Sequence, residues 1–212
     1  MTSAPWTRRG EGYPADNFPA IMQRMDQTAS APRRSGRTPL IALLCGAVVA
    51  VLLGVNDRRH PGGAHAVKFG FDSVIEFKTV VSCAIGVLLL VQLLLALWMY
   101  GKLGGSSAPR WVGPTHRTVG VITVVVSLPV AYDCLLAFGI QTYEPRVTAH
   151  ALLGCAVYGA FVVKMFAVRS RSSPAWFLPV AGGVLFALFM AAVLTSAVWY
   201  SVQYGFPTGN EY

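Results

Sequence analysis

Two histidines in the sequence open apolar stretches, and each is followed by a glycine four residues later. The first copy is "HRTVG", with His116 and Gly120, and the second is "HALLG", with His150 and Gly154. A neutral imidazole can ligate a haem iron, and a glycine one helical turn along lets a macrocycle approach the backbone. The pattern therefore indicates candidate haem ligands. A polar residue at the end of a helix is the alternative interpretation.

The sequence around His150 is also rich in potential metal ligands. Asp133 and Cys134 lie near the end of the preceding apolar stretch, and Cys155 follows His150 by little more than one turn. Thiolate and imidazole groups suit copper, so metal handling by these four residues is one interpretation. The other is that the cysteines are small apolar side chains in the core. The chain has no CxxC pair, so neither a zinc site nor a disulfide framework is indicated.

Composition identifies the elements that must position these residues. The chain has 212 residues, of which 54% are hydrophobic and 12% are charged, about half the charge of a typical soluble domain. Five stretches are apolar enough to cross a bilayer, which takes about 20 residues. They cover residues 40–55, 79–100, 118–140, 148–168 and 175–201. We therefore predict an all-α integral membrane protein with five transmembrane helices, in which spans two to five form the core and the short first span is more peripheral.

The distribution of positive charge predicts the topology. Residues 1–38 contain six arginines and little apolar sequence, which predicts a disordered, basic, cytoplasmic tail before a transmembrane domain at 39–212. Lys and Arg are more numerous in the loops on the side of this tail, so the N-terminus is expected in the cytoplasm and the C-terminus outside the cell membrane. This bias accounts for the net charge of +8 without a nucleic-acid partner. The first span is expected to be retained, because the Ala64–Ala66 motif lies too far from it for signal-peptide cleavage.

This topology separates the two histidines. His116 opens span three at the cytoplasmic face and His150 opens span four at the outer face, about 30 Å apart, so they cannot share one iron. On the outer side, His65 or His60 could be the second ligand of a haem bound by His150. Basic residues nearby are candidate partners of the propionates, namely Arg58, Arg59, Lys68 and Arg146. His116 has no histidine partner and is interpreted as structural.

Polar residues inside the spans are costly and therefore informative. Gln92 is expected to hydrogen-bond to a neighbouring helix. Asp133, which follows the kink expected at Pro129, should face the bundle interior, be protonated or have a cationic partner. Close helix approach is expected at the glycines of spans four and five, namely Gly154, Gly159, Gly182 and Gly183.

Two resemblances follow from these segments. The histidines that open successive spans, in "THRTVG" and "AHALLG", resemble those of cytochrome b-561-type transmembrane electron carriers. That resemblance implies haem b and electron transfer, with His116 and His150 at ligand positions. Residues from about 75 to 207 resemble an uncharacterised actinobacterial family of small multi-pass membrane proteins. The segments that carry this resemblance are "SLPVAYDCLLAFG", "HALLGCAVYGAFVVKM", "PVAGGVLF" and "LTSAVWY".

Two functions are therefore predicted as alternatives. One is an accessory subunit of a larger membrane complex. The other is a b-type electron-transfer protein with one haem near the outer face, exchanging electrons with an external carrier or a quinone. Outer-leaflet copper handling is a third alternative. Nucleophile, phosphate-binding and dinucleotide-binding motifs are missing from the sequence, which argues against an ordinary hydrolase or transferase.

Overall fold

A computed structural model describes residues 37–59, 63–103, 107–171 and 173–207, and in these ranges every regular element is a helix. The predicted tail at 1–38 lies outside the described residues except for its last two positions. The elements are α2 (Arg37–Arg59), α3 (Val74–Met99), α4 (Val112–Tyr132), the π-helix η2 (Asp133–Ala137), α5 (Pro145–Arg169), α6 (Phe177–Val193), the π-helix η3 (Leu194–Val198) and α7 (Trp199–Tyr204).

Five helical segments are long and apolar enough to cross a membrane, which confirms the predicted fold class. They run over Arg37–Asn56, Val74–Met99, Val112–Ala137, Pro145–Arg169 and Phe177–Tyr204. The second begins five residues before the apolar stretch does, because Ser73 caps the helix by accepting a hydrogen bond from the N–H of Glu76 at 3.1 Å. The charged residues Glu76 and Lys78 interrupt the apolar sequence in the first two turns of α3, so hydropathy alone places the start of the span later.

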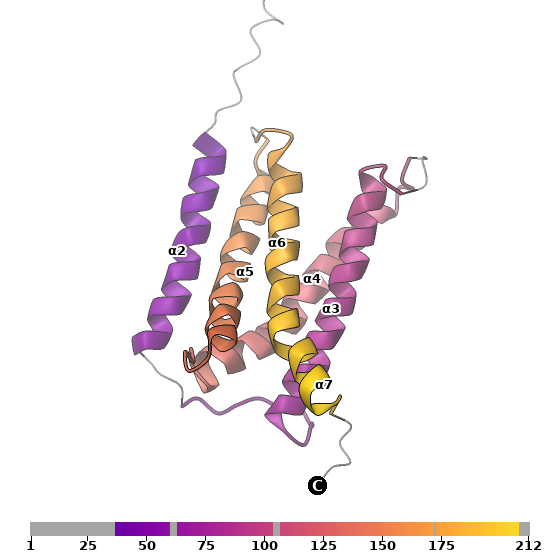
Figure 1. The fold of residues 1–212 in the computed structure, drawn as a ribbon. Coiled ribbons are helices and arrows are strands. Elements are labelled where there is room, and N and C mark those ends of the chain that lie inside the picture. Colours follow the sequence, from indigo (N-terminus) through magenta and orange to yellow (C-terminus); the bar gives the residue numbers. More distant parts are fainter. Residues whose placement is uncertain (1–36, 60–62, 104–106, 172, 208–212) are drawn as a thin grey trace, which may run out of the picture. The chain divides into compact units, whose positions relative to one another are not determined.

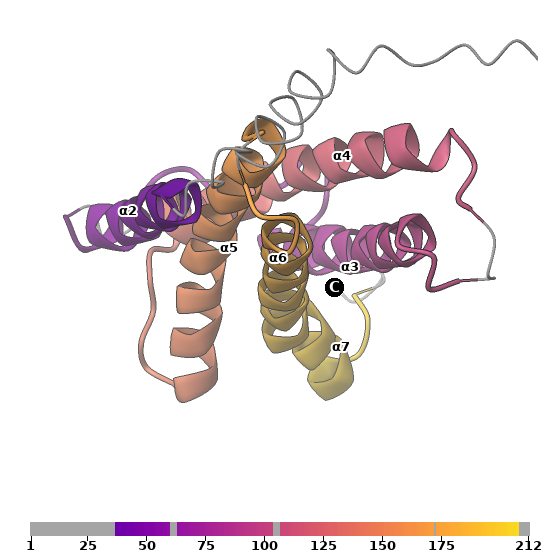
Figure 2. The same cartoon turned by 90° about the horizontal axis from the view of Figure 1, so that it is seen from above.

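Successive membrane-length helices run in alternating directions. In Figures 1 and 2, α3 lies beside α4, α6 lies beside α5, and α2 lies along the far side of α5. We call the end of the bundle where α5 begins the Pro145 end, and the opposite one the Arg169 end. Most side chains of α2 are exposed, including Leu40, Leu44 and Leu52. This confirms the prediction of a more peripheral first span.

The backbones of α2 and α5 touch at a pair of glycines. A Cβ atom on Gly46 would lie 2.6 Å from the carbonyl oxygen of Gly159, and one on Gly159 would lie 2.5 Å from that of Gly46. The close approach predicted at Gly159 is therefore confirmed, with a helix partner that sequence analysis did not identify. The same prediction was wrong for three other glycines, around which there is open space, namely Gly154, Gly182 and Gly183.

The Pro145 end differs from the rest of the bundle, because two helices change there from α-helical to π-helical hydrogen bonding. After Pro129, α4 continues as η2, in which the N–H of Phe138 reaches the carbonyl of Asp133 at 2.9 Å. The segment before α3 packs across this turn. Its N–H groups at 63 and 64 donate to the carbonyls of residues 137 and 136, each at 3.2 Å. The loop is thereby attached to the helix end by its backbone.

Candidate functional site

A cavity of about 300 Å³ opens at the Pro145 end between α3, α4, α5 and α6. Its wall is mainly apolar, with a few polar side chains that include Lys78, His150 and Tyr158. A second hollow of about 330 Å³ shares Lys78, Cys134 and His150 with the first and adds aromatic side chains from the end of the chain. We call the two together the His150 cavity. Its size and lining resemble those of small-molecule sites, which typically occupy about 300–1,000 Å³.

The Nδ1 atom of His150 forms hydrogen bonds with α6 and η3, and its Nε2 atom is available to a ligand. Its Nδ1 lies 3.1 Å from the carbonyl oxygen of Ala192 and 3.3 Å from the hydroxyl of Thr195. A carbonyl can only accept, so in the neutral imidazole Nδ1 carries the proton and Nε2 has a lone pair. No described residue forms a hydrogen bond with Nε2. The side chain can therefore accept a hydrogen bond from a ligand or ligate a metal.

Only the second of the two His–Gly pairs belongs to this cavity. Gly154, one turn from His150, lines it and would have no atom within 4 Å of an added Cβ. At the Arg169 end, the corresponding space over Gly120 is filled by Gln92, whose Nε2 would lie 3.1 Å from a Cβ there. The structure thus places the two histidines at opposite ends of the bundle and gives their glycines different neighbours.

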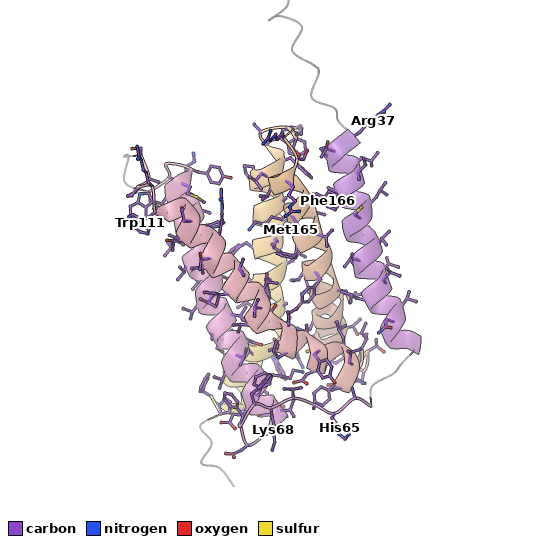
Figure 3. All side chains as sticks on the ribbon, turned by 180° about the vertical axis from the view of Figure 1, so that it is seen from behind. Arg37, His65, Lys68, Trp111, Met165 and Phe166 are labelled. Atoms are coloured by element: carbon purple, nitrogen blue, oxygen red, sulfur yellow. The ribbon has the colours of Figure 1, made fainter. Side chains whose placement is uncertain are left out.

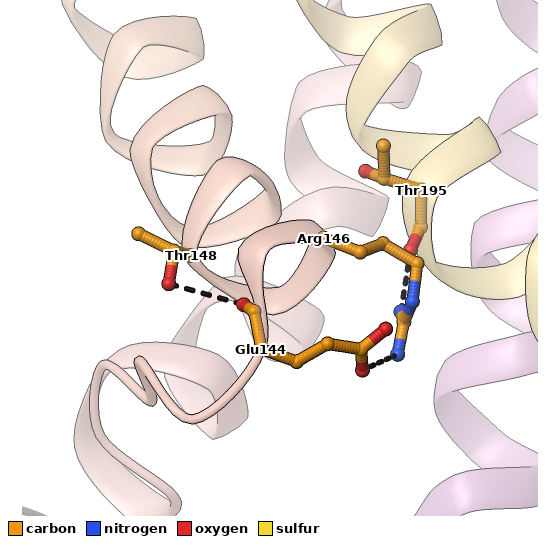
Figure 4. A network of polar contacts seen from close by, with 4 residues as sticks. All are labelled: Glu144, Arg146, Thr148 and Thr195. Atoms are coloured by element: carbon orange, nitrogen blue, oxygen red, sulfur yellow. Dashed lines mark hydrogen bonds and ion pairs between the residues drawn. The ribbon is translucent and has the colours of Figure 1, made fainter.

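Arg146 links the start of α5 to η3, the π-helix that follows α6 (Figure 4). In η3 the N–H of Trp199 reaches the carbonyl of Leu194, and the guanidinium donates to the Thr195 carbonyl at 2.8 Å. The same group forms an ion pair with Glu144 at 3.0 Å and lies 3.5 Å from the centre of the Trp199 ring. Its positive charge is therefore matched by a carboxylate and an aromatic face. These contacts give Arg146 a structural role, beside its predicted one as a propionate partner.

Lys78 is the second cation of the cavity wall, and sequence analysis did not select it. It lies on the second turn of α3, is half-buried, and lines both hollows. Its ammonium lies 4.7 Å from the centre of the Phe138 ring. In the sequence Lys78 immediately precedes the apolar stretch at 79–100, at the end of the bundle where His150 also lies, and this position was the signal that could have identified it.

The four candidate copper ligands do not face one common site: His150 and Cys134 line the cavity, whereas Asp133 and Cys155 are buried and do not line it. Asp133 is fully buried, and its Oδ1 accepts a hydrogen bond from the N–H of Val67 at 2.8 Å. The interior location was predicted correctly; the observed partner is a loop N–H. Cys134 lines the cavity, and Cys155 is buried in α5. In the described part of the chain, no three His, Cys, Asp or Glu side chains are grouped so that they could hold a metal ion.

The predicted second ligand, His65, is not in the wall of the cavity. It is exposed on the segment before α3, at the edge of the bundle (Figure 3). Lys68, a predicted propionate partner on the same segment, donates to the carbonyl of Asp72 at 3.1 Å. His60 lies outside the described residues, as do the side chains of Arg58 and Arg59. His150 is thus the one histidine among the cavity-lining residues that the structure describes.

A pair of hydroxyls on the cavity wall also escaped sequence analysis. The Ser127 hydroxyl on α4 lies 3.1 Å from that of Tyr158 on α5 and donates to the carbonyl of Val124 at 2.7 Å. Both residues line the cavity. They link two helices across an otherwise apolar layer. A serine and a tyrosine in separate spans carry no distinctive spacing, so only the packing of the helices reveals the pair.

Comparison with known proteins places the chain in a family. Residues 39–208 match the model of the Family of unknown function (DUF6529), and the chain belongs to that family. No curated protein and no solved structure matches the chain.

Proposed function

Starting from membership of a family of unknown function, we propose that this protein is a membrane-embedded binding protein for a lipid-soluble ligand that carries a hydroxyl group. The observation that supports this most is the orientation of His150, whose Nδ1 faces the Ala192 carbonyl while Nε2 remains an acceptor on the wall of an apolar cavity. The ligand would place its apolar part among the side chains of four helices and donate its hydroxyl to Nε2. Such a role is compatible with an accessory subunit of a larger complex.

The composition of the wall supports an amphipathic ligand. The inner part is apolar, and burial of a hydrocarbon chain there is favourable by about 0.8 kcal/mol for each CH₂ group. The polar side chains of the first hollow include the imidazole of His150, the ammonium of Lys78 and the hydroxyls of Ser127 and Tyr158. Few polar groups in an apolar wall fix the orientation of a ligand in such sites.

Haem b is the second candidate, and the same histidine favours it. Histidines that ligate a metal usually donate their other ring N–H to a carbonyl or carboxylate, as Nδ1 of His150 does toward Ala192. The cavity fits a haem in this respect alone. The described wall offers no second histidine to complete a bis-histidine site. A haem held here would have His150 as its one histidine ligand within the described residues.

Alkylation of Cys134 provides a direct test, because this cysteine lines both hollows. The purified protein in mild detergent is treated with N-ethylmaleimide, with and without dioctanoylglycerol, a hydroxyl-bearing apolar probe. Modification at each cysteine is followed by peptide mass spectrometry. We expect the probe to slow alkylation of Cys134 severalfold and to leave Cys45 and Cys83, which do not line the cavity, unchanged. Equal rates at Cys134 with and without probe would contradict the proposal.

Two variants sharpen this test. Gly154→Leu should fill the open space beside His150 and abolish protection by the probe, whereas Gly182→Leu, at a glycine with similar open space on α6, should retain it. Absorption spectra of the oxidised and dithionite-reduced protein, with a pyridine haemochrome assay, separate the two candidates. One haem per chain, lost in His150→Ala and retained in His116→Ala, would replace the proposed ligand with haem.

A further inference from the structure

The His150 cavity has an unmatched positive charge. Lys78 lines both hollows, and its ammonium lies over the Phe138 ring. Among the described residues, no carboxylate lies within ion-pair distance of it, since the one ion pair found there joins Arg146 to Glu144. The other charged group of the wall, Arg146, is thus neutralised locally. The wall therefore includes one cationic side chain that has no ion-pair partner among the described residues.

Two carboxylates of the same end of the bundle make other contacts. Glu76 accepts a hydrogen bond from the N–H of Asp72 at 3.1 Å. Asp133 is fully buried and accepts a hydrogen bond from the N–H of Val67 at Oδ1, while its Oδ2 has no hydrogen-bond partner among the described residues. Neither forms an ion pair with Lys78. An ammonium at the edge of an apolar cavity interacts with an anion more strongly than it would in water, because the local dielectric constant is lower. A bound anion is therefore the natural complement of this wall.

We infer that the ligand is an anionic lipid with a hydroxyl-bearing head group, of the phosphatidylglycerol class. The phosphodiester would lie at Lys78, a hydroxyl of the glycerol head group would donate to Nε2 of His150, and part of an acyl chain would enter the apolar part of the cavity. This inference rests on the proposed function and adds the charge and the class of the ligand. A neutral hydroxyl-bearing lipid satisfies only His150, and a zwitterionic choline lipid brings a second cation toward Lys78.

Four lipids with identical acyl chains separate the interaction of the charge with Lys78 from that of the hydroxyl with His150. Phosphatidylglycerol has both the charge and the hydroxyl, phosphatidylmethanol has only the charge, diacylglycerol has only the hydroxyl, and phosphatidylcholine has no free hydroxyl and no net charge. Each is titrated into the full-length protein in neutral detergent. Bound lipid is counted by native mass spectrometry, and occupancy of the cavity is measured by protection of Cys134 from alkylation. We expect phosphatidylglycerol to bind about tenfold more tightly than diacylglycerol, as for a hydrogen-bonded charged group.

Variants of Lys78 and His150 test whether the preference for phosphatidylglycerol arises in the cavity. Lys78→Gln should lower phosphatidylglycerol affinity about tenfold, to that of diacylglycerol, and leave diacylglycerol unchanged. Lys78→Arg should keep the preference for anionic lipid. His150→Ala should remove the difference between phosphatidylglycerol and phosphatidylmethanol. Lys164→Gln is the matched control, because Lys164 is a half-buried lysine on α5 near the other end of the bundle and does not line the cavity.

The outcomes distinguish this inference from the proposed function. If diacylglycerol protects Cys134 but anionic lipids have no advantage, or if Lys164→Gln reduces that advantage as much as Lys78→Gln does, the inference is wrong and the proposed function stands. If none of the four lipids protects Cys134, both are wrong.

Discussion

The side-chain amide of Gln92 donates a hydrogen bond of 2.6 Å to the main-chain carbonyl of His116. The amide lies against Gly120, because a Cβ at that position would be 3.1 Å from its nitrogen. One side chain of α3 thus contacts both residues of the first His–Gly pair on α4. The glycine at this end gives room to a polar residue of the neighbouring helix, and the spacing that indicated a cofactor reflects helix packing there.

The two glycines should respond differently to the same substitution. Gly120→Ala requires the Gln92 amide to move by a few tenths of an ångström, which should weaken an interhelical hydrogen bond of a kind that contributes about 0.6 kcal/mol in membrane proteins. Alanine also favours a helix over glycine by about 1 kcal/mol at either position. We therefore expect Gly154→Ala to raise the thermal unfolding midpoint in detergent and Gly120→Ala to raise it less or lower it. In a Gln92→Ala background the two substitutions should have equal effects, and a persistent difference would contradict this account.

The helices were predictable because each spans an apolar stretch of sufficient length, but their starts were not. The start of α3 at Val74 depends on the Ser73 cap, and the charges of Glu76 and Lys78 that follow it interrupt the apolar sequence. The two π-helices were also missed. The π-helices that begin at Asp133 and Leu194 arise where backbone N–H groups bond to the carbonyl five residues earlier instead of four. Only the kink expected at Pro129 pointed toward one of them.

Four of the site residues selected from the sequence line the cavity, namely Cys134, Arg146, His150 and Gly154, but most of its wall was not selected. His150 stood out as a polar residue that opens an apolar span. Lys78 stands just before the apolar stretch at 79–100 and Tyr158 lies within the one at 148–168, and neither position distinguishes a binding residue. The sequence gives no distance between spans. Which side chains of α3 and α5 share a cavity is decided by how the helices pack.

The contact between α2 and α5 should tolerate no side chain at either glycine. Gly46→Ala or Gly159→Ala places a Cβ within 2.6 Å of the opposing carbonyl, so the helices must separate. Overpacking of this kind typically costs about 1–3 kcal/mol. Unfolding midpoints and distances between spin labels on the two helices would report the change. The control is Gly54→Ala, further along α2, where nothing lies within 4 Å of the added atom and no loss is expected.

Asp133 should hold the loop before α3 through its carboxylate oxygen. In Asp133→Ala the N–H of Val67 loses its acceptor, so its hydrogen exchange should be about fivefold faster if the bond contributes about 1 kcal/mol. Asp133→Asn keeps an oxygen at the same place and should preserve the protection. Exchange at residues 63–67, followed by mass spectrometry, measures both. Fast exchange in the asparagine variant would mean that charge, and not the acceptor, holds the loop.

The proton of the neutral His150 ring should reside on Nδ1. The Ala192 carbonyl, 3.1 Å away, can only accept, and the Thr195 hydroxyl, 3.3 Å away, already donates to the Ala191 carbonyl at 2.8 Å. Nitrogen NMR of protein labelled with ¹⁵N-histidine should therefore show the Nδ1–H tautomer for the signal that disappears in His150→Gln. A proton on Nε2 would make this nitrogen a donor, which would favour a ligand carbonyl over a ligand hydroxyl and exclude ligation of a metal by the same atom.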